Sequence, residues 1–192
     1  MFQNNYKFDY LRETAFHEAG HTFMHELFDL PYEDVLVNED GGELNFIYQE
    51  ITKTSSLLSK LIYACICFSG SIAEDMYKYP RGLDDSQDSI YGSSLYFGGA
   101  ITDLYKYQEM GLTRSYMNSL LDFTRKIIID NWSIVETIAN SLAKNKQLTS
   151  KEVKNLLSNC ELKEKHHVYI LELQAVFLKS SDGEIIYTNT SQ

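Results

Sequence analysis

The feature that most restricts the fold of this chain is the segment His17-Glu18-Ala19-Gly20-His21, which lies inside a stretch with helical periodicity. Apolar residues recur at helical spacing over 9–28 and form one stripe: Leu11, Ala15, Ala19, Phe23 and Leu27. A helix over this range places His17 and His21 one turn apart on the same face, so both imidazoles can reach one metal ion. The sequence therefore predicts a metal-binding helix.

The residue types in this segment are those of a catalytic zinc site. Catalytic zinc takes three protein ligands and leaves a fourth position to water. Glu18 follows the first histidine, so it lies beside the metal and can take a proton from the water there. Gly20 costs about 1 kcal/mol relative to alanine inside a helix, so we expect another backbone to pack closely against it. This expectation and the position inside a helix weaken the alternative, a pair of surface histidines.

A third ligand must come from elsewhere, and two acidic segments offer one. Asp103 opens a helical segment in otherwise apolar surroundings, and a lone carboxylate in an apolar site needs a partner such as a metal ion. Alternatively, Asp103 is an ordinary acidic residue in the first turn of a helix, where the helix dipole favours a negative charge. Asp88 lies with Asp84 and Asp85 in a Ser-rich loop that we expect to be solvated. We predict Asp103 as the third ligand and keep Asp88 as its rival.

The other histidines are predicted not to bind the metal. With 3.6 residues per turn, His25 has drifted roughly 80° around the helix from His17. We therefore expect it to pack in the core or to support a ligand. His166 and His167 are adjacent and are predicted to be solvated residues that lead into a strand.

The remaining pattern predicts a mainly helical fold with two small β-hairpins. The first hairpin joins 35–37 to 44–48 through Glu39-Asp40-Gly41-Gly42, and a C-terminal hairpin joins 168–173 to 184–187 through Asp182-Gly183. Further helices are predicted over 57–77, over 102–143 with a break near 111–113, and over 149–157, where Thr149 and Glu152 match a capping box. We expect one domain over 1–160, with 161–192 as a β-hairpin extension packed on it.

Composition narrows the classes of partner and compartment. The chain has 192 residues, 44% of them hydrophobic, and a net charge of -10, which disfavours a nucleic-acid partner. Its three cysteines form no CxxC pair, so a reducing compartment fits best. The N-terminus lacks a signal-peptide pattern. The apolar run over 57–73 contains Lys60 and Gly70 and is short for a bilayer. We therefore expect a cytoplasmic protein that does not enter the membrane.

Several segments together resemble the peptidase domain of FtsH-type ATP-dependent zinc proteases. Residues 14–21 (Thr-Ala-Phe-His-Glu-Ala-Gly-His) are similar to the family's T-A-x-H-E-A-G-H, and 69–75 to its G-G-x-x-A-E-E. Residues 99–104 are similar to its G-A-S-N-D-[IL], whose aspartate is the third zinc ligand, and 131–142 with 147–153 to its closing helices. The resemblance implies an FtsH-like metallopeptidase domain. It also implies zinc bound by His17, His21 and Asp103, with Glu18 as the general base.

The chain departs from the family pattern in several places. No ATPase module precedes the domain, so we expect a stand-alone endopeptidase for peptides or unfolded segments, unless a separate unfoldase or adaptor delivers substrates. The segment between Glu74 and Asp103 is longer than in the family, which keeps Asp88 open as the ligand. Glu74 also fits the glutamate ligand of another zincin type, although its Ala-Glu-Asp context favours the FtsH-type helix. The tail after Cys160 has no counterpart.

Two alternative functions follow from other features. The segment from His17 to His25 is also similar to the H-E-x-G-H-x-x-x-H of ImmA/IrrE-type regulatory proteases, although the closing helices count against it. The acidic surface, the tail and the missing ATPase also fit a catalytically inactive interaction module on a protease-like fold. The intact Glu18 counts against this second alternative. The sequence predicts neither the cleavage preference nor the oligomeric state.

Overall fold

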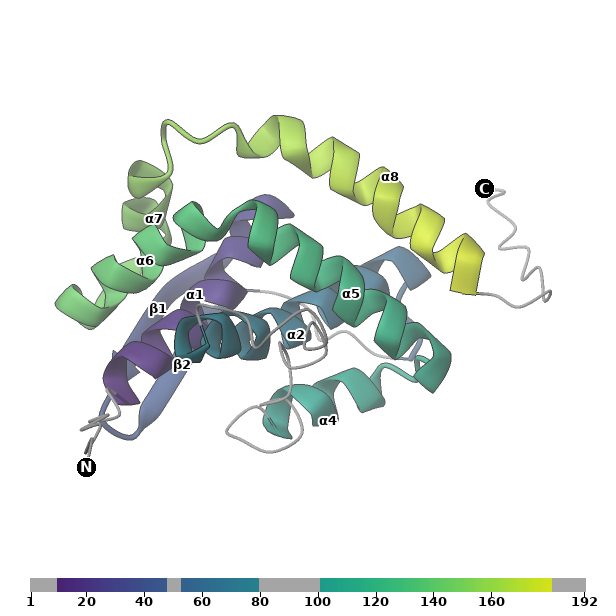
Figure 1. The fold of residues 1–192 in the computed structure, drawn as a ribbon, viewed down its shortest axis with the longest axis horizontal. Helices are drawn as coiled ribbons and strands as arrows, with labels where there is room; N and C mark the ends of the chain where they lie inside the picture. Colours follow the sequence, from purple (N-terminus) through teal and green to yellow (C-terminus); the bar gives the residue numbers. More distant parts are fainter. Residues whose placement is uncertain (1–9, 48–52, 80–100, 181–192) are drawn as a thin grey trace, which may run out of the picture.

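The structure, a computed structural model, describes residues 10–47, 53–79 and 101–180. Over these residues it is mainly helical, as the sequence predicts, and it has one small antiparallel sheet (Figure 1). The elements in chain order are α1 (Tyr10–Leu27), β1 (Tyr32–Asn38), β2 (Gly41–Phe46), α2 (Leu57–Lys78), α4 (Ile101–Glu109), α5 (Arg114–Asp130), α6 (Trp132–Asn145), β3 (Gln147–Thr149), α7 (Ser150–Leu156) and α8 (Leu162–Ser180).

Helix α1 lies in the middle of the fold, against α2, α6 and the sheet. Ala15, Ala19 and Phe23 of its predicted stripe are fully buried. Gly20 lies directly against α2, because a Cβ there would come 2.4 Å from the backbone oxygen of Ser69. The predicted close approach of another backbone at Gly20 is therefore confirmed.

Helix α2 is a second core helix. Among the described residues it is long and apolar enough to cross a membrane, but 61% of its most apolar window is buried inside the fold. Such burial is typical of the core helix of a soluble protein, which agrees with the predicted buried helix. Ser56 begins the helix by accepting a hydrogen bond from the backbone N–H of Ser59.

The sheet has the strand order β2-β1-β3, with antiparallel pairs throughout. The predicted first hairpin is confirmed as β1 and β2, whose buried Val35, Val37 and Leu44 face the core. Strand β3 was not predicted. It pairs with β1 and leads into α7, whose predicted capping box between Thr149 and Glu152 is present. Within the described part of the chain, β2 is therefore an edge strand.

The helical stretch after Arg114 is divided at Asn131, where a single helix was predicted. The buried Asn131 amide donates hydrogen bonds to the Ile127 carbonyl and to the Tyr169 hydroxyl. A short polar side chain that bonds its own backbone in this way competes with helix continuation. The result is a pair of helices, α5 and α6, in place of one.

The predicted C-terminal β-hairpin is wrong in its first arm, because 168–173 lie within helix α8. Tyr169 and Leu173 are four residues apart, so they share one helix face and are buried, whereas Val168 and Leu171 are exposed. A short apolar run of this kind fits either a strand or one face of a helix, and packing beside α5 selects the helix. The second arm, 184–187, lies outside the described residues.

Candidate metal centre

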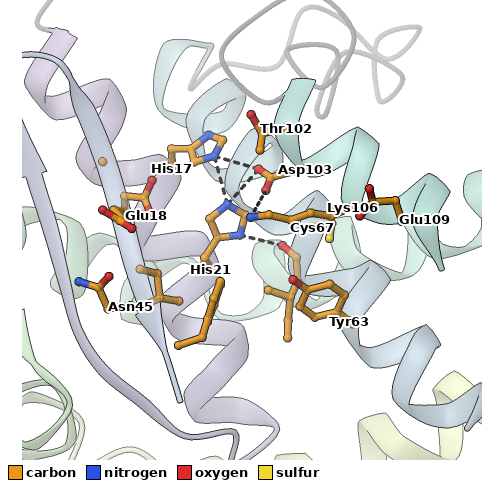
Figure 2. Close-up of a pocket in the computed structure, with 15 residues that line it drawn as sticks. His17, Glu18, His21, Asn45, Tyr63, Cys67, Thr102, Asp103, Lys106 and Glu109 are labelled. Atoms are coloured by element: carbon orange, nitrogen blue, oxygen red, sulfur yellow. Dashed lines mark hydrogen bonds and ion pairs between the residues drawn. The ribbon is translucent and has the colours of Figure 1, made fainter. Parts of the chain in front are cut away.

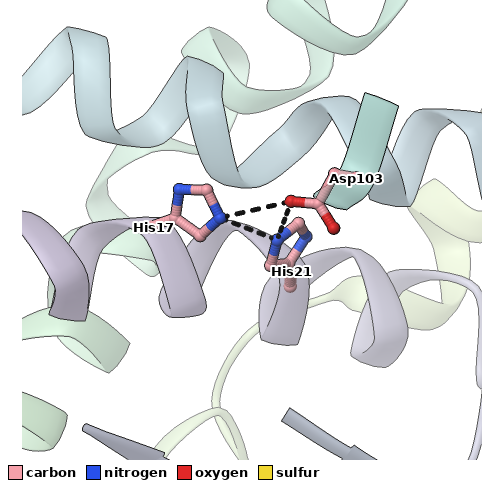
Figure 3. A group of neighbouring side chains, drawn as sticks. All are labelled: His17, His21 and Asp103. Atoms are coloured by element: carbon pink, nitrogen blue, oxygen red, sulfur yellow. Dashed lines mark hydrogen bonds and ion pairs between the residues drawn. The ribbon is translucent and has the colours of Figure 1, made fainter. Parts of the chain in front are cut away.

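Three side chains from α1 and α4 converge on one point (Figure 3). His17 Nε2 and His21 Nε2 are 3.1 Å apart. Oδ2 of Asp103, in the first turn of α4, lies 3.4 Å from His17 Nε2 and 3.2 Å from His21 Nε2. A tetrahedral zinc ion with bonds of 2.0–2.1 Å would hold its ligand atoms about 3.3 Å apart. The separations in this triad therefore fit the donor set and size of a zinc site.

The second nitrogen of each imidazole fixes which atom faces the triad. His21 Nδ1 lies 2.8 Å from the carbonyl oxygen of Ile66, and His17 Nδ1 lies 3.0 Å from Oε2 of Glu74. Both partner atoms on α2 are acceptors, so each Nδ1 carries a hydrogen and each Nε2 is the atom left to face the metal position. Such contacts orient metal-ligating histidines. Glu74 therefore supports His17 and is outside the ligand triad, although the sequence also allowed it as a ligand.

Glu74 is itself held in place by Lys78. The Lys78 ammonium pairs with Glu74 Oε1 and lies 3.0 Å from Oε2 of Glu13 on α1. Burial alone would raise the pKa of Glu74, but its bonds with His17 and Lys78 lower it. The carboxylate therefore stays ionised and keeps accepting the His17 proton.

Glycine in α2 makes room for the triad. A Cβ at Gly70 would lie 2.5 Å from His21 Nε2 and 2.6 Å from His17 Nε2. Any larger residue would therefore push against the nitrogens that face the metal position. Gly70 belongs to the family-like segment 69–75, but this role was not predicted from the sequence.

Glu18 lies beside the triad, under strand β2. Its side chain is buried, and a Cβ at Gly42 would come 2.4 Å from its Cγ. Burial raises the pKa of Glu18, although the nearby His21 and His17 lower it in part. A carboxylate with a raised pKa is a better proton acceptor near neutral pH.

The triad and Glu18 line a common cavity of about 620 Å³ (Figure 2). One wall comes from β2 (Gly42 to Phe46), and the others come from α1, α2 and α4. The cavity therefore brings an edge strand alongside the metal triad. This arrangement offers backbone hydrogen-bonding groups and a metal position to the same ligand.

Charges within the triad are strongly coupled. Burial alone would lower the pKa of His17, but its bonds with Asp103 and Glu74 raise it to about 10. Burial would raise the pKa of Asp103, but the charge on His21 and the bonds from both histidines hold it well below its usual range. A proton shared by these groups is what a divalent cation would displace on binding.

His25 lies outside the triad, as predicted. It is fully buried. Its ring is stacked on that of Phe46, with the ring centroids 4.8 Å apart, and lies edge-on to the ring of Tyr32. His166, in contrast, was predicted to be solvated, but its Nδ1 donates a hydrogen bond to the Leu27 carbonyl, 2.8 Å away at the end of α1. His166 is thus a structural residue between α8 and α1.

The triad contains the predicted ligands His17, His21 and Asp103, whereas the rival Asp88 lies outside the described residues. Sequence reasoning missed Lys106, whose ammonium lies 3.4 Å from Oδ1 of Asp103. Its position one turn after Asp103 is a signal that could have drawn attention to it.

In comparisons with known proteins, neither a protein-family model nor a curated protein matches the chain. The chemistry of the site is therefore inferred from the geometry of this cavity and from the resemblance of the motifs.

Proposed function

We propose that the protein is a zinc-dependent endopeptidase that hydrolyses peptide bonds of peptides or unfolded segments. The observation that carries the proposal is the triad of His17, His21 and Asp103 at zinc-like separations, with Glu18 in the same cavity. The resemblance of residues 14–21 and 99–104 to FtsH-type peptidases supports it independently. On this proposal the protein acts in the cytoplasm.

A bound zinc ion and the residues of the chain would supply different parts of the chemistry. Zinc, when bound, supplies a Lewis acid for the scissile carbonyl and lowers the pKa of water. Glu18 would accept the proton of the attacking water and return it to the leaving amine. The hydrogen bonds that His17 donates to Glu74 and His21 donates to the Ile66 carbonyl would keep the imidazoles in the ligand orientation throughout.

Strand β2 offers a way to hold the substrate. An extended peptide can add to the open edge of a sheet and gain backbone hydrogen bonds without regard to its sequence. The wall of the cavity from Gly42 to Phe46 belongs to such an edge strand. Folded proteins do not present a free extended segment, so this wall favours peptides and unfolded chains as substrates.

The first test measures the zinc content of the purified full chain and its cleavage of unfolded casein. We expect about one zinc per chain in the wild type and in Glu18→Gln, with cleavage reduced at least 100-fold in Glu18→Gln. Asp103→Ala should lose zinc, because only two of the three protein ligands, the imidazoles of His17 and His21, would remain. Asp88→Ala and the surface change Asp122→Ala should keep both zinc and activity.

Each outcome has a distinct meaning. Cleavage by Glu18→Gln at the wild-type rate would contradict the proposed role of Glu18. Absence of zinc from the wild type after incubation with zinc would contradict the metal centre. Zinc without cleavage of any peptide would favour the alternative of an interaction module or of a protease for a single protein.

A further inference from the structure

Lys106 extends from α4 into the cavity, and its ammonium lies beside the metal triad (Figure 2). Its Nζ is 3.4 Å from Oδ1 of Asp103 and 5.7 Å from the centre of the Phe46 ring on β2. The side chain is 38% exposed, so a ligand in the cavity can reach the ammonium. Lys106 therefore carries a positive charge to the place where a substrate would lie between α4 and β2.

Among the described residues that line this cavity, Lys106 is the only lysine or arginine. The other charged residues in this described lining are acidic: Glu18, Glu43, Asp103 and Glu109. Most of the wall would thus repel an anionic part of a ligand. An anionic group could be accepted near the metal and Lys106, and hardly elsewhere in the cavity.

The contact with Asp103 leaves Lys106 able to bind a second anion. Its length of 3.4 Å exceeds the 2.7–2.9 Å typical of a strong charge-assisted hydrogen bond. The oxygen involved is Oδ1, whereas Oδ2 faces the two imidazoles. A divalent metal on Oδ2 would draw the charge of Asp103 toward itself, and the region would then favour an added anion.

The Lys106 side chain is also held beside the strand wall of the cavity. The ring of Phe46 adds a cation–π contact that keeps the ammonium beside β2.

We propose that Lys106 is a specificity-determining residue that binds a substrate carboxylate beside the scissile bond. The carboxylate is either an acidic side chain or the free C-terminus of the peptide, and the second would direct cleavage to a bond close to the chain end. This inference rests on the proposed peptidase function and adds to it a preference for anionic peptides at one position.

The test measures equilibrium binding of peptides to zinc-loaded Glu18→Gln protein, in which cleavage is suppressed. One pair of fluorescent peptides differs only in a free or amidated C-terminus. A second pair is amidated and differs only in an internal Glu or Gln. Each pair is titrated against the Glu18→Gln chain alone and with Lys106→Met, Lys106→Arg or Lys126→Met added. Lys126 pairs with Glu172 on the surface, so its substitution controls for the change in net charge.

We expect the carboxylate member of at least one pair to bind about tenfold more tightly than its neutral partner. Lys106→Met should abolish this preference, whereas Lys106→Arg and Lys126→Met should retain it. A preference in the first pair alone identifies the terminal carboxylate as the ligand, and one in the second pair alone identifies an acidic side chain. Equal binding within both pairs, or a preference that survives Lys106→Met, would overturn the proposal.

Zinc content and cleavage by the chain with Glu18 intact separate this inference from the proposed function. Zinc binding and cleavage without any preference for a carboxylate would overturn the role of Lys106 alone. Preferential binding of carboxylate peptides that the intact chain never cleaves would contradict the peptidase function and support the role of Lys106. Measuring zinc in every variant also shows whether Lys106→Met acts indirectly by displacing Asp103.

Discussion

Two buried histidines in the two halves of α1, His17 and His25, have pKa values shifted in opposite directions. In the N-terminal half, burial of His17 is outweighed by bonds with Asp103 and Glu74, which raise its pKa to about 10. In the C-terminal half, burial against Phe46 and the charge on His21 lower the pKa of His25 to about 3, although a bond with the Leu30 backbone opposes this shift.

The difference comes from the elements packed around each half of the helix. Helices α2 and α4 bring the carboxylates of Glu74 and Asp103 to His17, whereas the sheet region brings the rings of Tyr32 and Phe46 to His25. Partners supplied by other elements therefore decide whether a buried imidazole on this helix can carry charge. Helical spacing alone does not decide it.

The largest expected effect comes from Gly20→Ala, between the two halves. The added methyl would meet the Ser69 backbone oxygen at 2.4 Å, so α1 and α2 must move apart. We expect the free energy of unfolding to fall by about 3 kcal/mol in urea titrations. The exposed helical control Asn118→Ala should change it by less than about 0.5 kcal/mol. A Gly20→Ala protein as stable as wild type would show that the packing against α2 is looser than described.

A second prediction tests the partners of His17 in the N-terminal half of α1. Glu74→Ala removes the acceptor for His17 Nδ1 and leaves Lys78 with Glu13 as its acidic partner among the described residues. We expect zinc affinity, measured by competition with a chromophoric chelator, to fall roughly 10- to 100-fold. Glu172→Ala, which removes a surface carboxylate paired with Lys126, should leave it unchanged. Unchanged affinity in Glu74→Ala would mean that His17 is oriented without Glu74.

Structural features that depend on neighbouring residues could be predicted from the sequence. The range predicted for α1, 9–28, nearly equals Tyr10–Leu27, and the capping box between Thr149 and Glu152 is where the pattern indicates it. The pairing of His17 with His21 follows in the same way from helical spacing. These features depend on residues that are close to one another in the sequence.

Features that depend on distant partners were less accessible. Strand β3 has three residues and is defined by its pairing with β1, more than a hundred residues away in the sequence. The helical state of 168–173 depends on burial of Tyr169 and Leu173 beside α5. In the site, the Ile66 carbonyl has no side-chain signature at all, because any residue carries the same backbone acceptor.

A third prediction tests the half of α1 that holds His25. The folded state keeps a pKa of about 3 for His25, below the unfolded value near 6.5, so the unfolded state binds more protons between these values. Stability from this residue is therefore complete above about pH 6.5 and is lost as the pH falls. Between pH 7 and pH 5 the metal-free wild type should lose about 2 kcal/mol that His25→Phe does not lose. Urea unfolding at both pH values measures this, with the exposed His167→Phe as the control. Equal acid sensitivity in wild type and His25→Phe would contradict the buried, neutral state of His25.

The smallest expected effect lies at the end of α1. His166 of α8 donates to the Leu27 carbonyl in the last turn of α1, where backbone acceptors lack partners within the helix. His166→Ala should lower the free energy of unfolding by about 1 kcal/mol, whereas His167→Ala, one residue away and exposed, should have little effect. Zinc affinity should not change, because Leu27 lies six residues, more than one helical turn, beyond His21. A loss of zinc affinity in His166→Ala would show that the end of α1 is coupled to the triad, so that α8 contributes to the metal centre through the helix it contacts.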